Sequence, residues 1–431
     1  MTGRTRILVV KKKWLSIGSM GCFLIFPHSL IISFKLRLLK PRNPMFLKQL
    51  HLRAFRNYLE QEIEFTAQKT ILVGQNAQGK SNLLEAVELL ATLKSHRTFR
   101  DRELILEGAA NGQIHAIIER QYSIAELDIL LRRNGRRNLQ VNATTARRQV
   151  DFLGIINAIE FSCLDLELVR GAPECRRQWL DTLLVQLEPV YAHILGQYQH
   201  ILKQRNSLLK SLRKQQEVDT PLDSQEALSL ELWDQQLIEM GARVARRRAR
   251  CLARLTPLAT EWHARISGGK EELTLTYHPS VTWESDEVTA VQQALAAKLQ
   301  QRRLAELHLG ATVVGPHRDE ISLMIDGTPA KTYGSQGQQR TLVLALKLAE
   351  LSLVETVVGE PPLLLLDDVL AELDLERQSQ LLNAVEDRFQ TLITTTHLNR
   401  FDDQWRQSAQ ILQVKQGQIH PCWLSELEEG R

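Results

Sequence analysis

Cysteine is scarce in this chain, and the few copies are widely separated. The 431 residues contain five cysteines, and no two of them have the spacing of a metal site or a redox pair. They are Cys22, Cys163, Cys175, Cys251 and Cys422. This absence excludes a cysteine-based metal or redox motif and fits a reducing compartment, so we expect a cytoplasmic protein.

Internal repeats, low-complexity tracts and base-reading motifs are also missing. At 431 residues the chain can bury a large core and divide into two lobes. Acidic residues are missing from residues 1–44, which contain nine lysines and arginines. Because the formal net charge of the whole chain is +4, the remaining residues carry a net −5. Such a mildly acidic body does not by itself indicate DNA binding, so any basic surface must come from local clusters.

The chain does contain a complete phosphate-binding loop after an apolar run at residues 70–73. The loop consists of Gly74, Gln75, Asn76, Ala77, Gln78, Gly79, Lys80 and Ser81. Glycines let successive backbone N–H groups curl round an anion, the lysine reaches the β- and γ-phosphates, and the serine hydroxyl can bind Mg²⁺. Residues 82–90 follow with helical spacing of apolar positions. This order of strand, loop and helix predicts a site for ATP and Mg²⁺.

A second nucleotide element lies at residues 362–368, where four leucines precede Asp367 and Asp368. The pattern predicts a buried parallel strand with two carboxylates at its C-terminal end. Because ligands bind at this edge of α/β sheets, Asp367 can reach Mg²⁺ and Asp368 can orient or deprotonate an attacking water. The alternative is a buried strand followed by a solvated turn.

Three further segments complete the set of motifs. Residues 335–340 read Ser-Gln-Gly-Gln-Gln-Arg before a helical run at 341–349, which predicts a second anion site at a helix start. Residues 371–374 form a short acidic loop, and a strand at 391–396 ends in His397. The order of these motifs resembles that of the ABC-class ATPases.

This resemblance implies a composite site, because two heads of such ATPases enclose two ATP molecules and each signature motif contacts the nucleotide of the other head. Lys80 would then balance phosphate charge, and Ser81 and Asp367 would hold Mg²⁺. Asp368 would act on the attacking water, and His397 on that water or on the γ-phosphate. The opposing chain would supply Ser335, Gly337 and Gln338.

Three segments outside these motifs resemble one family in particular. Residues 45–58 alternate as an edge strand would and end in Phe-Arg-Asn-Tyr. Residues 171–181 contain Gly-Ala-Pro and Arg-Arg-Gln-Trp-Leu-Asp, and residues 315–319 read Gly-Pro-His-Arg-Asp. Together they resemble the RecF family of bacterial recombination and gap-repair proteins, from residue 45 to about residue 418. At 161–165 the family pattern has Pro-Glu before the aspartate and this chain does not, so we carry over no water-orienting role there.

The RecF resemblance implies an ATP-dependent DNA-binding protein of recombinational repair, in which ATP drives dimerisation of two heads on DNA and hydrolysis releases them. It also implies loading of recombinase at single-strand gaps, with RecR and RecO as partners. Asp368 is one methylene shorter than the glutamate common in transporters, so we expect a slow ATPase that serves as a conformational switch.

The spacing of the motifs indicates an insertion. Between Ser81 and Asp367, apolar residues recur at helical spacing over 180–201 and again over 230–262, with a polar link at 213–224. Each predicted arm helix has about 35 residues, or roughly 50 Å at 1.5 Å per residue. Ordinary helix packing inside a domain is the alternative interpretation.

We expect an α/β fold: an ABC-type ATPase head split by a helical insertion lobe. The expected parts are an extension at 1–44, the head at 45–165, the helical arm at 166–309 and the rest of the head at 310–431. Within the arm, Pro189 and Pro257 are expected to kink or end helices.

Two arginine clusters are candidates for contact with the DNA backbone. The first lies on the second arm helix and could follow phosphates, which would make binding strongly salt-dependent. It consists of Arg243, Arg246, Arg247, Arg248 and Arg250. A solvated helix face paired with acids such as Glu239 explains the same run. The second, Arg-Arg-Asn-Gly-Arg-Arg at 132–137, predicts a hairpin tip. We expect recognition of DNA shape, gaps or junctions rather than of sequence.

The N-terminal extension needs a separate interpretation. Residues 14–34 carry no formal charge and are about as long as a membrane span, although Pro27, His28 and Ser29 interrupt them. An exported ATP site would face a compartment without ATP, which argues against a signal peptide, and a membrane anchor is the remaining alternative. On the family resemblance we expect Met45 to be the natural start, with residues 1–44 either mistaken upstream translation or disordered, and no membrane partner.

Rival classes share parts of this pattern. A transporter ATPase would need a shorter spacing between loop and acids and a membrane partner. A structural chromosome-organising head would need a far longer arm. Small-molecule kinases also use phosphate loops, but the serine-glycine-glutamine signature has no role in them.

Overall fold

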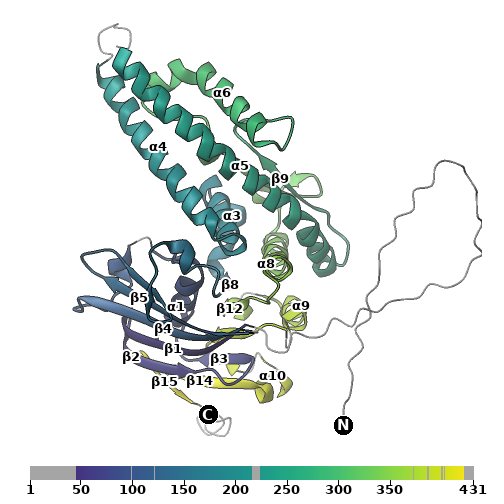
Figure 1. The fold of residues 1–431 in the computed structure, drawn as a ribbon. Helices are drawn as coiled ribbons and strands as arrows, with labels where there is room; N and C mark the ends of the chain where they lie inside the picture. The colour runs from purple at the N-terminus through teal and green to yellow at the C-terminus, as the bar shows by residue number, and fades with distance from the viewer. Residues whose placement is uncertain are drawn as a thin grey trace, which may run out of the picture. The chain divides into compact units, whose positions relative to one another are not determined.

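The protein is described by a computed structural model that places residues 45–98, 100–120, 122–215, 224–371, 373–385, 388–398, 401 and 403–421 (Figure 1). The extension expected at residues 1–44, including its uncharged stretch, lies outside these described residues. Among the helices that the structure describes, none is both long and apolar enough to cross a membrane.

Six strands form the sheet that carries the nucleotide motifs. Their order is β15 (Gln418–Pro421), β14 (Ala409–Lys415), β3 (Lys69–Val73), β13 (Thr391–Thr395), β12 (Leu363–Asp367) and β8 (Ala158–Ser162). The pairings from β14 to β8 are parallel, whereas β15 runs antiparallel to β14. The strands β3 and β13 are buried along their whole length, as expected for parallel strands covered on both faces. The strands predicted around the phosphate loop, the paired acids and His397 are therefore confirmed.

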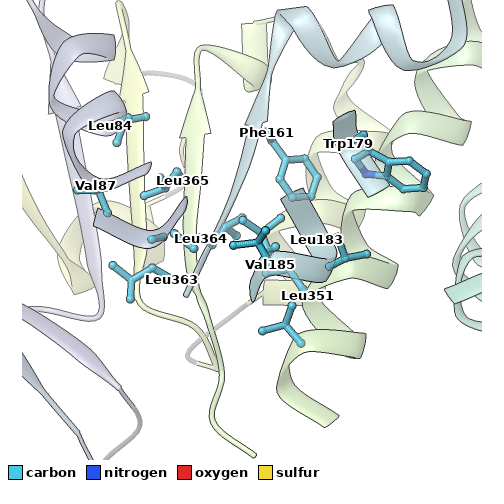
Figure 2. Packing of buried hydrophobic residues seen from close by; sticks show 14 of the residues in the cluster. Leu84, Val87, Phe161, Trp179, Leu183, Val185, Leu351, Leu363, Leu364 and Leu365 are labelled. Atoms are coloured by element: carbon cyan, nitrogen blue, oxygen red, sulfur yellow. The ribbon is translucent and has the colours of Figure 1, made fainter. Parts of the chain in front are cut away.

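Helices cover both faces of this sheet. Figure 2 shows the leucines of β12 between Leu84 of α1 (Lys80–Thr92) and Leu351 of α8 (Gln336–Val358). These side chains are at most 1% exposed. The helices predicted at 82–90 and 341–349 are thus confirmed, and each begins with a nucleotide motif at one end of the sheet.

The other six-stranded sheet is antiparallel. Its order is β2 (Tyr58–Glu64), β1 (Phe46–Phe55), β4 (Asn111–Glu119), β5 (Ile124–Arg132), β6 (Asn138–Val141) and β7 (Thr144–Thr145). The prediction of an edge strand at residues 45–58 was wrong, because β1 pairs with β2 on one side and with β4 on the other. A tight turn at Arg56 and Asn57 folds β2 back along the side of β1 that would otherwise be free.

A helical lobe is inserted after β8. It contains α3 (Pro173–Leu187), α4 (Val190–Gln215), α5 (Ser224–Ser267) and α6 (Val288–Leu309). Helix α5 returns along α4, and α6 packs against both (Figure 1). The predicted break at Pro189 is confirmed, since it separates α3 from α4, whereas Pro257 lies inside α5 and does not end it.

The insertion also contains a strand that helical spacing could not indicate. Strand β9 (Leu273–His278) pairs antiparallel with β10 (Glu320–Ile325), which in turn pairs with β11 (Thr328–Pro329). This small sheet joins the segment before α6 to the segment after it. The remaining short helices are α2 (Glu167–Arg170), α7 (Ala330–Tyr333), α9 (Leu375–Val385) and α10 (Asp403–Ser408).

Two of the segments that resemble the RecF family, residues 171–181 and 315–319, meet beside helix α5 of the inserted lobe. Arg248 of α5 donates two hydrogen bonds of 2.8 Å to Asp181 of α3, and a third to the carbonyl oxygen of Pro316 at 2.7 Å. Arg177 donates to the carbonyl oxygen of Asp319 at 2.6 Å. Arg248 and Asp181 are buried, so loss of either partner would leave an uncompensated charge. These segments therefore anchor the helical lobe.

Candidate nucleotide site

The phosphate-binding loop connects β3 to α1. Gly79 immediately precedes the helix and has a φ of 118°, which L side chains rarely adopt. A Cβ atom there would lie 2.6 Å from the amide nitrogen of Asn57. A Cβ atom on Gly74 would lie 2.4 Å from the carbonyl oxygen of Val414 on β14. Both glycines are therefore needed for the path of the loop.

The Phe-Arg-Asn-Tyr segment braces this loop. Asn57 donates from Nδ2 to the carbonyl oxygen of Gln78 at 2.9 Å, and the next carbonyl oxygen along the loop accepts from the Tyr58 hydroxyl at 2.9 Å. Arg56 donates two charge-assisted hydrogen bonds to Glu85 of α1, at 2.6 and 2.8 Å. In the sequence this segment indicated only the family. Its contact with the phosphate-binding loop was not predicted. The available signal was three consecutive polar side chains, Arg56 to Tyr58, directly after a strand of alternating apolar and polar residues.

Lys80 is held inside the loop. Its Nζ atom donates to the carbonyl oxygens of Gly74 at 2.8 Å and of Gln75 at 3.0 Å, and the residue is only 4% exposed. Burial lowers the pKa of Lys80, while the nearby carboxylates of Asp368 and Asp367 act in the opposite direction. The ammonium group thus lies between the loop and the two acids predicted to face it.

Ser81 and Asp367 come together as the motif pattern predicted. The Ser81 hydroxyl donates to Asp367 Oδ1 at 2.8 Å, and Thr394 of β13 donates to the same oxygen at 2.7 Å. Mg²⁺ prefers oxygen ligands at about 2.0–2.1 Å in octahedral geometry, which places adjacent ligands about 2.9 Å apart. The Ser81 and Asp367 oxygens therefore fit two neighbouring positions around such an ion.

Asp368 and His397 lie at the same end of the sheet. Asp368 has a φ of 53°, and its backbone nitrogen donates to the Thr394 hydroxyl at 2.8 Å. Thr395 at the end of β13 lies in register with the last residue of β3, and its carbonyl oxygen accepts from the Gly74 nitrogen at 3.2 Å. His397 follows two residues later and is exposed. This edge of the sheet therefore gathers the loop, both acids and the histidine.

The signature segment forms the N-terminus of α8. Ser335 is the N-cap residue: its hydroxyl accepts from the Gln338 nitrogen at 3.2 Å, and its own nitrogen donates to Gln338 Oε1 at 2.8 Å. The Gly337 carbonyl oxygen accepts from Arg377 of α9 at 3.3 Å. Within the described part of the chain, the hydrogen bonds of the Ser335 side chain are with Gln338 rather than with the phosphate-binding loop. Ser335 and Gln336 are exposed and Gly337 and Gln338 are half-buried at this helix start, a type of position that can bind an anion.

The five clustered arginines of α5 are paired with acids. The pairs are Arg243 with Glu239, Arg246 and Arg250 with Asp286, Arg247 with Glu188, and Arg248 with Asp181. This arrangement agrees with the interpretation of a helix face balanced by acids. The segment at 132–137 does connect β5 to β6, as the hairpin prediction required, and Arg132, Arg133 and Arg136 are exposed there.

Known proteins resemble this chain over nearly all of its described length. Residues 46–420 match the family model described as the RecF/RecN/SMC N terminal domain. The chain is 74% identical over 384 residues to the DNA replication and repair protein RecF of Synechocystis sp., covering 89% of this chain and 100% of that protein. It is 65% identical over 381 residues to the RecF protein of Gloeothece citriformis, covering 87% of this chain and 99% of that protein.

Two solved structures are similar in fold. Both are described as the recombination mediator protein RecF in the RecFOR pathway, one as RecF-ATPrS and the other as RecF-ATP. Their TM-scores are 0.80 and 0.79, each at 31% sequence identity. Each covers 88% of this chain, and the match spans 99% and 98% of the two solved chains.

Proposed function

Because this chain belongs to the RecF family of DNA replication and repair proteins, we propose that it is an ATP-dependent DNA-binding protein of recombinational gap repair. The resemblance stated from the sequence is confirmed by the high identity to curated RecF proteins, and the α/β ABC-type head by the solved RecF structures. ATP as the nucleotide is supported by the relative described as RecF-ATP.

The contact between Ser81 and Asp367 carries the proposal of a nucleotide-binding head. Ser81 and Asp367 would hold Mg²⁺, and Lys80 would turn from the loop carbonyls towards the β- and γ-phosphates. The backbone of Gly74 to Ser81 would surround the phosphates. The metal would neutralise charge that develops on the phosphate oxygens.

Hydrolysis would depend on two residues at the sheet edge. Asp368 would accept a proton from the attacking water or orient that water, and His397 would contact the same water or the γ-phosphate. We expect slow turnover, because the carboxylate of Asp368 stands on a side chain one methylene shorter than that of the glutamate common in transporters. Slow hydrolysis would let ATP act as a conformational switch.

The second half of each site would come from another copy of the chain. Ser335 and Gly337 are exposed or half-exposed at the start of α8, and Gln338 holds the Ser335 hydroxyl in the capping position. Such a helix start can bind the γ-phosphate of a nucleotide held elsewhere. ATP would thus join two heads into a homodimer on DNA.

We assign the head to residues 45–165 and 310–431 and the helical arm to residues 166–309. The pairing of β8 with β12 supports a head assembled from both ends of the chain. The longest arm helix, α5, has 44 residues, which favours the short arm expected here over the long coiled coil of a chromosome-organising head. Gapped or junction DNA, RecR and RecO are the proposed partners in a cytoplasmic setting, and the exposed arginines of the β5–β6 hairpin are candidate phosphate contacts.

The proposal is tested by measuring ATP hydrolysis and the affinity for a gapped duplex by fluorescence anisotropy. Wild-type protein should bind the duplex more tightly with ATP than without it, and turnover should be slow. Lys80→Ala should lose both hydrolysis and the ATP-dependent gain in DNA affinity. Equal DNA affinity with and without ATP, or wild-type turnover of tens per second, near the typical enzyme range, would contradict the proposal.

A further inference from the structure

A cluster of one histidine and two glutamates lies in the head, away from the phosphate loop. Glu88 belongs to α1, His96 to the segment after that helix, and Glu160 to β8. Glu88 is seven residues after Ser81, or about 10 Å along the helix. None of the nucleotide motifs includes these three residues.

Glu88 and Glu160 both lie within hydrogen-bonding distance of the same imidazole nitrogen, Nδ1 of His96. His96 Nδ1 lies 2.8 Å from Glu88 Oε2 and 2.9 Å from Glu160 Oε2. Glu88 Oε2 also accepts from the backbone nitrogen of His96 at 3.2 Å, which fixes the loop against α1. One ligand atom from each residue lies within 4.8 Å of the other two. Three ligand atoms therefore converge on one point.

The environment of Glu160 is incompletely satisfied. Its side chain is 11% exposed, and its second oxygen, Oε1, is buried and accepts no hydrogen bond within the described part of the chain. A buried acceptor without a donor costs free energy, so this oxygen needs a proton or a cation.

We propose that Glu88, His96 and Glu160 bind one divalent transition-metal ion of the Zn²⁺ class. Two carboxylates and a neutral imidazole balance a doubly positive ion, and an imidazole nitrogen favours Zn²⁺ over Mg²⁺ or Ca²⁺. In tetrahedral zinc sites ligand atoms are about 3.3 Å apart for bonds near 2.0–2.1 Å, so small outward shifts would admit the ion. Glu160 Oε1 or a water takes the fourth position.

The ion would clamp α1 to the strand at the edge of the core sheet. Glu160 lies in register with Leu365 of β12, two residues before Asp367. The metal would therefore tie the helix that starts at the phosphate loop to the strands that carry the acids. This role is independent of ATP and of a second chain, so its test is independent of the proposed function.

The test uses the full-length protein, without a polyhistidine tag, nucleotide or Mg²⁺. Zn²⁺ alone is added, excess ion is removed by gel filtration, and bound zinc is measured by mass spectrometry of the element. Wild type should retain one zinc per chain. The isosteric variant Glu160→Gln and the variant His96→Gln should retain none, and Zn²⁺ should raise the thermal unfolding temperature of wild type but not of Glu160→Gln.

Two controls separate this site from others. His115→Gln is matched, because the His115 ring nitrogens also lie near two carboxylates, 3.5 Å from Glu126 and 3.7 Å from Asp128. Asp367→Asn removes the candidate Mg²⁺ ligand of the nucleotide site. Both variants should keep one zinc. Absence of zinc from wild type, retention by Glu160→Gln, or loss from Asp367→Asn alone would overturn the proposal.

Cobalt supplies a second readout that does not depend on whether a variant folds. Co²⁺ bound to wild type should give the intense visible absorption of a four- or five-coordinate site with a nitrogen ligand. A spectrum like that of the hydrated ion would overturn the proposal.

Discussion

Ser81 donates a hydrogen bond to Asp367 at 2.8 Å, although 286 positions separate the two residues in the chain. Strands β4 to β7 of the antiparallel sheet, the helical lobe and the signature helix all lie between them in sequence. Parallel pairing of β3, β13 and β12 brings the two residues to one edge of the core sheet. The ATPase head is therefore complete only when both ends of the chain have folded together.

Replacement of Asp368 tests its part in hydrolysis. Asparagine tolerates positive φ, so Asp368→Asn should keep the backbone conformation and the ability to bind ATP. Because asparagine cannot accept the proton, kcat should fall about 100-fold or more, within the range of general-base catalysis. Steady-state phosphate release and nucleotide binding measure the two effects. Asp403→Asn, which changes an exposed acid of α10, is the control, and equal kcat values for both variants would remove Asp368 from the mechanism.

Removal of the Tyr58 hydroxyl tests the brace on the phosphate loop. Tyr58→Phe removes one donor from the Gly79 carbonyl oxygen, which still accepts from the backbone nitrogens of Asn82 and Leu83, so the free energy of unfolding should fall by about 0.5–1.5 kcal/mol. It should also weaken ATP binding, because the loop loses a restraint. Urea unfolding and nucleotide titration measure both changes. Tyr122→Phe is the matched control at a side chain that is 89% exposed, and an equally small change in both variants would show that the brace is unimportant.

Segments with a local signature could be predicted from the sequence. Four leucines before two acids indicate a buried strand. Gly79 of the loop adopts a positive φ, which residues with a side chain rarely adopt. Long-range pairings could not be predicted. The position of β1 inside its sheet, the pairing of β9 with β10 and the Arg248–Asp181 contact each join residues far apart in sequence. No local pattern encodes such partners.

The difference between local patterns and long-range contacts also holds for the candidate site. Each of its motifs could be recognised separately in the sequence, because each has its own chemistry. The contributions of Asn57, Tyr58 and Thr394 were missed, because each acts through a hydrogen bond to a distant backbone or side chain. The arginines of α5 were ambiguous for a related reason, since acids from other elements neutralise most of them.

His317 makes stability depend on pH. Burial lowers its pKa to about 4, and the ring bonds to the Tyr198 hydroxyl at 2.7 Å and the Thr312 carbonyl oxygen at 3.0 Å. His317 binds a proton near pH 6.5 in the unfolded chain but only near pH 4 in the folded chain. Its contribution to the free energy of unfolding is therefore complete above pH 6.5 and is lost as the pH falls from 6.5 towards 4. The loss from pH 8 to pH 5 should be about 2 kcal/mol for this group.

Urea unfolding at the two pH values measures this effect against His317→Gln, which cannot titrate. Wild type should lose about 2 kcal/mol more than the variant between pH 8 and pH 5. Equal losses would mean that folding does not lower the pKa of His317.

The β5–β6 hairpin should contact DNA through its exposed arginines. Replacing Arg133 and Arg136 together by alanine should weaken binding to gapped duplex and reduce the slope of log affinity against log salt by about 2, at about 0.9 per phosphate contact. Fluorescence anisotropy over a series of salt concentrations gives the slope. The matched control replaces Arg243 and Arg250, which are paired with acids, and it should leave the slope nearly unchanged. Similar slopes for the two double variants would place the DNA elsewhere.

We propose that two chains share each ATP site. The mass of the protein in solution tests this sharing most directly. Light scattering should be recorded on the full chain with ATP, without ATP, and with ATP and gapped DNA, for wild type, Lys80→Arg and Ser335→Arg. We predict a shift from monomer to dimer with ATP that DNA strengthens and that both variants abolish. If the mass ignores ATP while hydrolysis persists, each chain works alone, and the assignment of Ser335 to the partner's nucleotide is wrong.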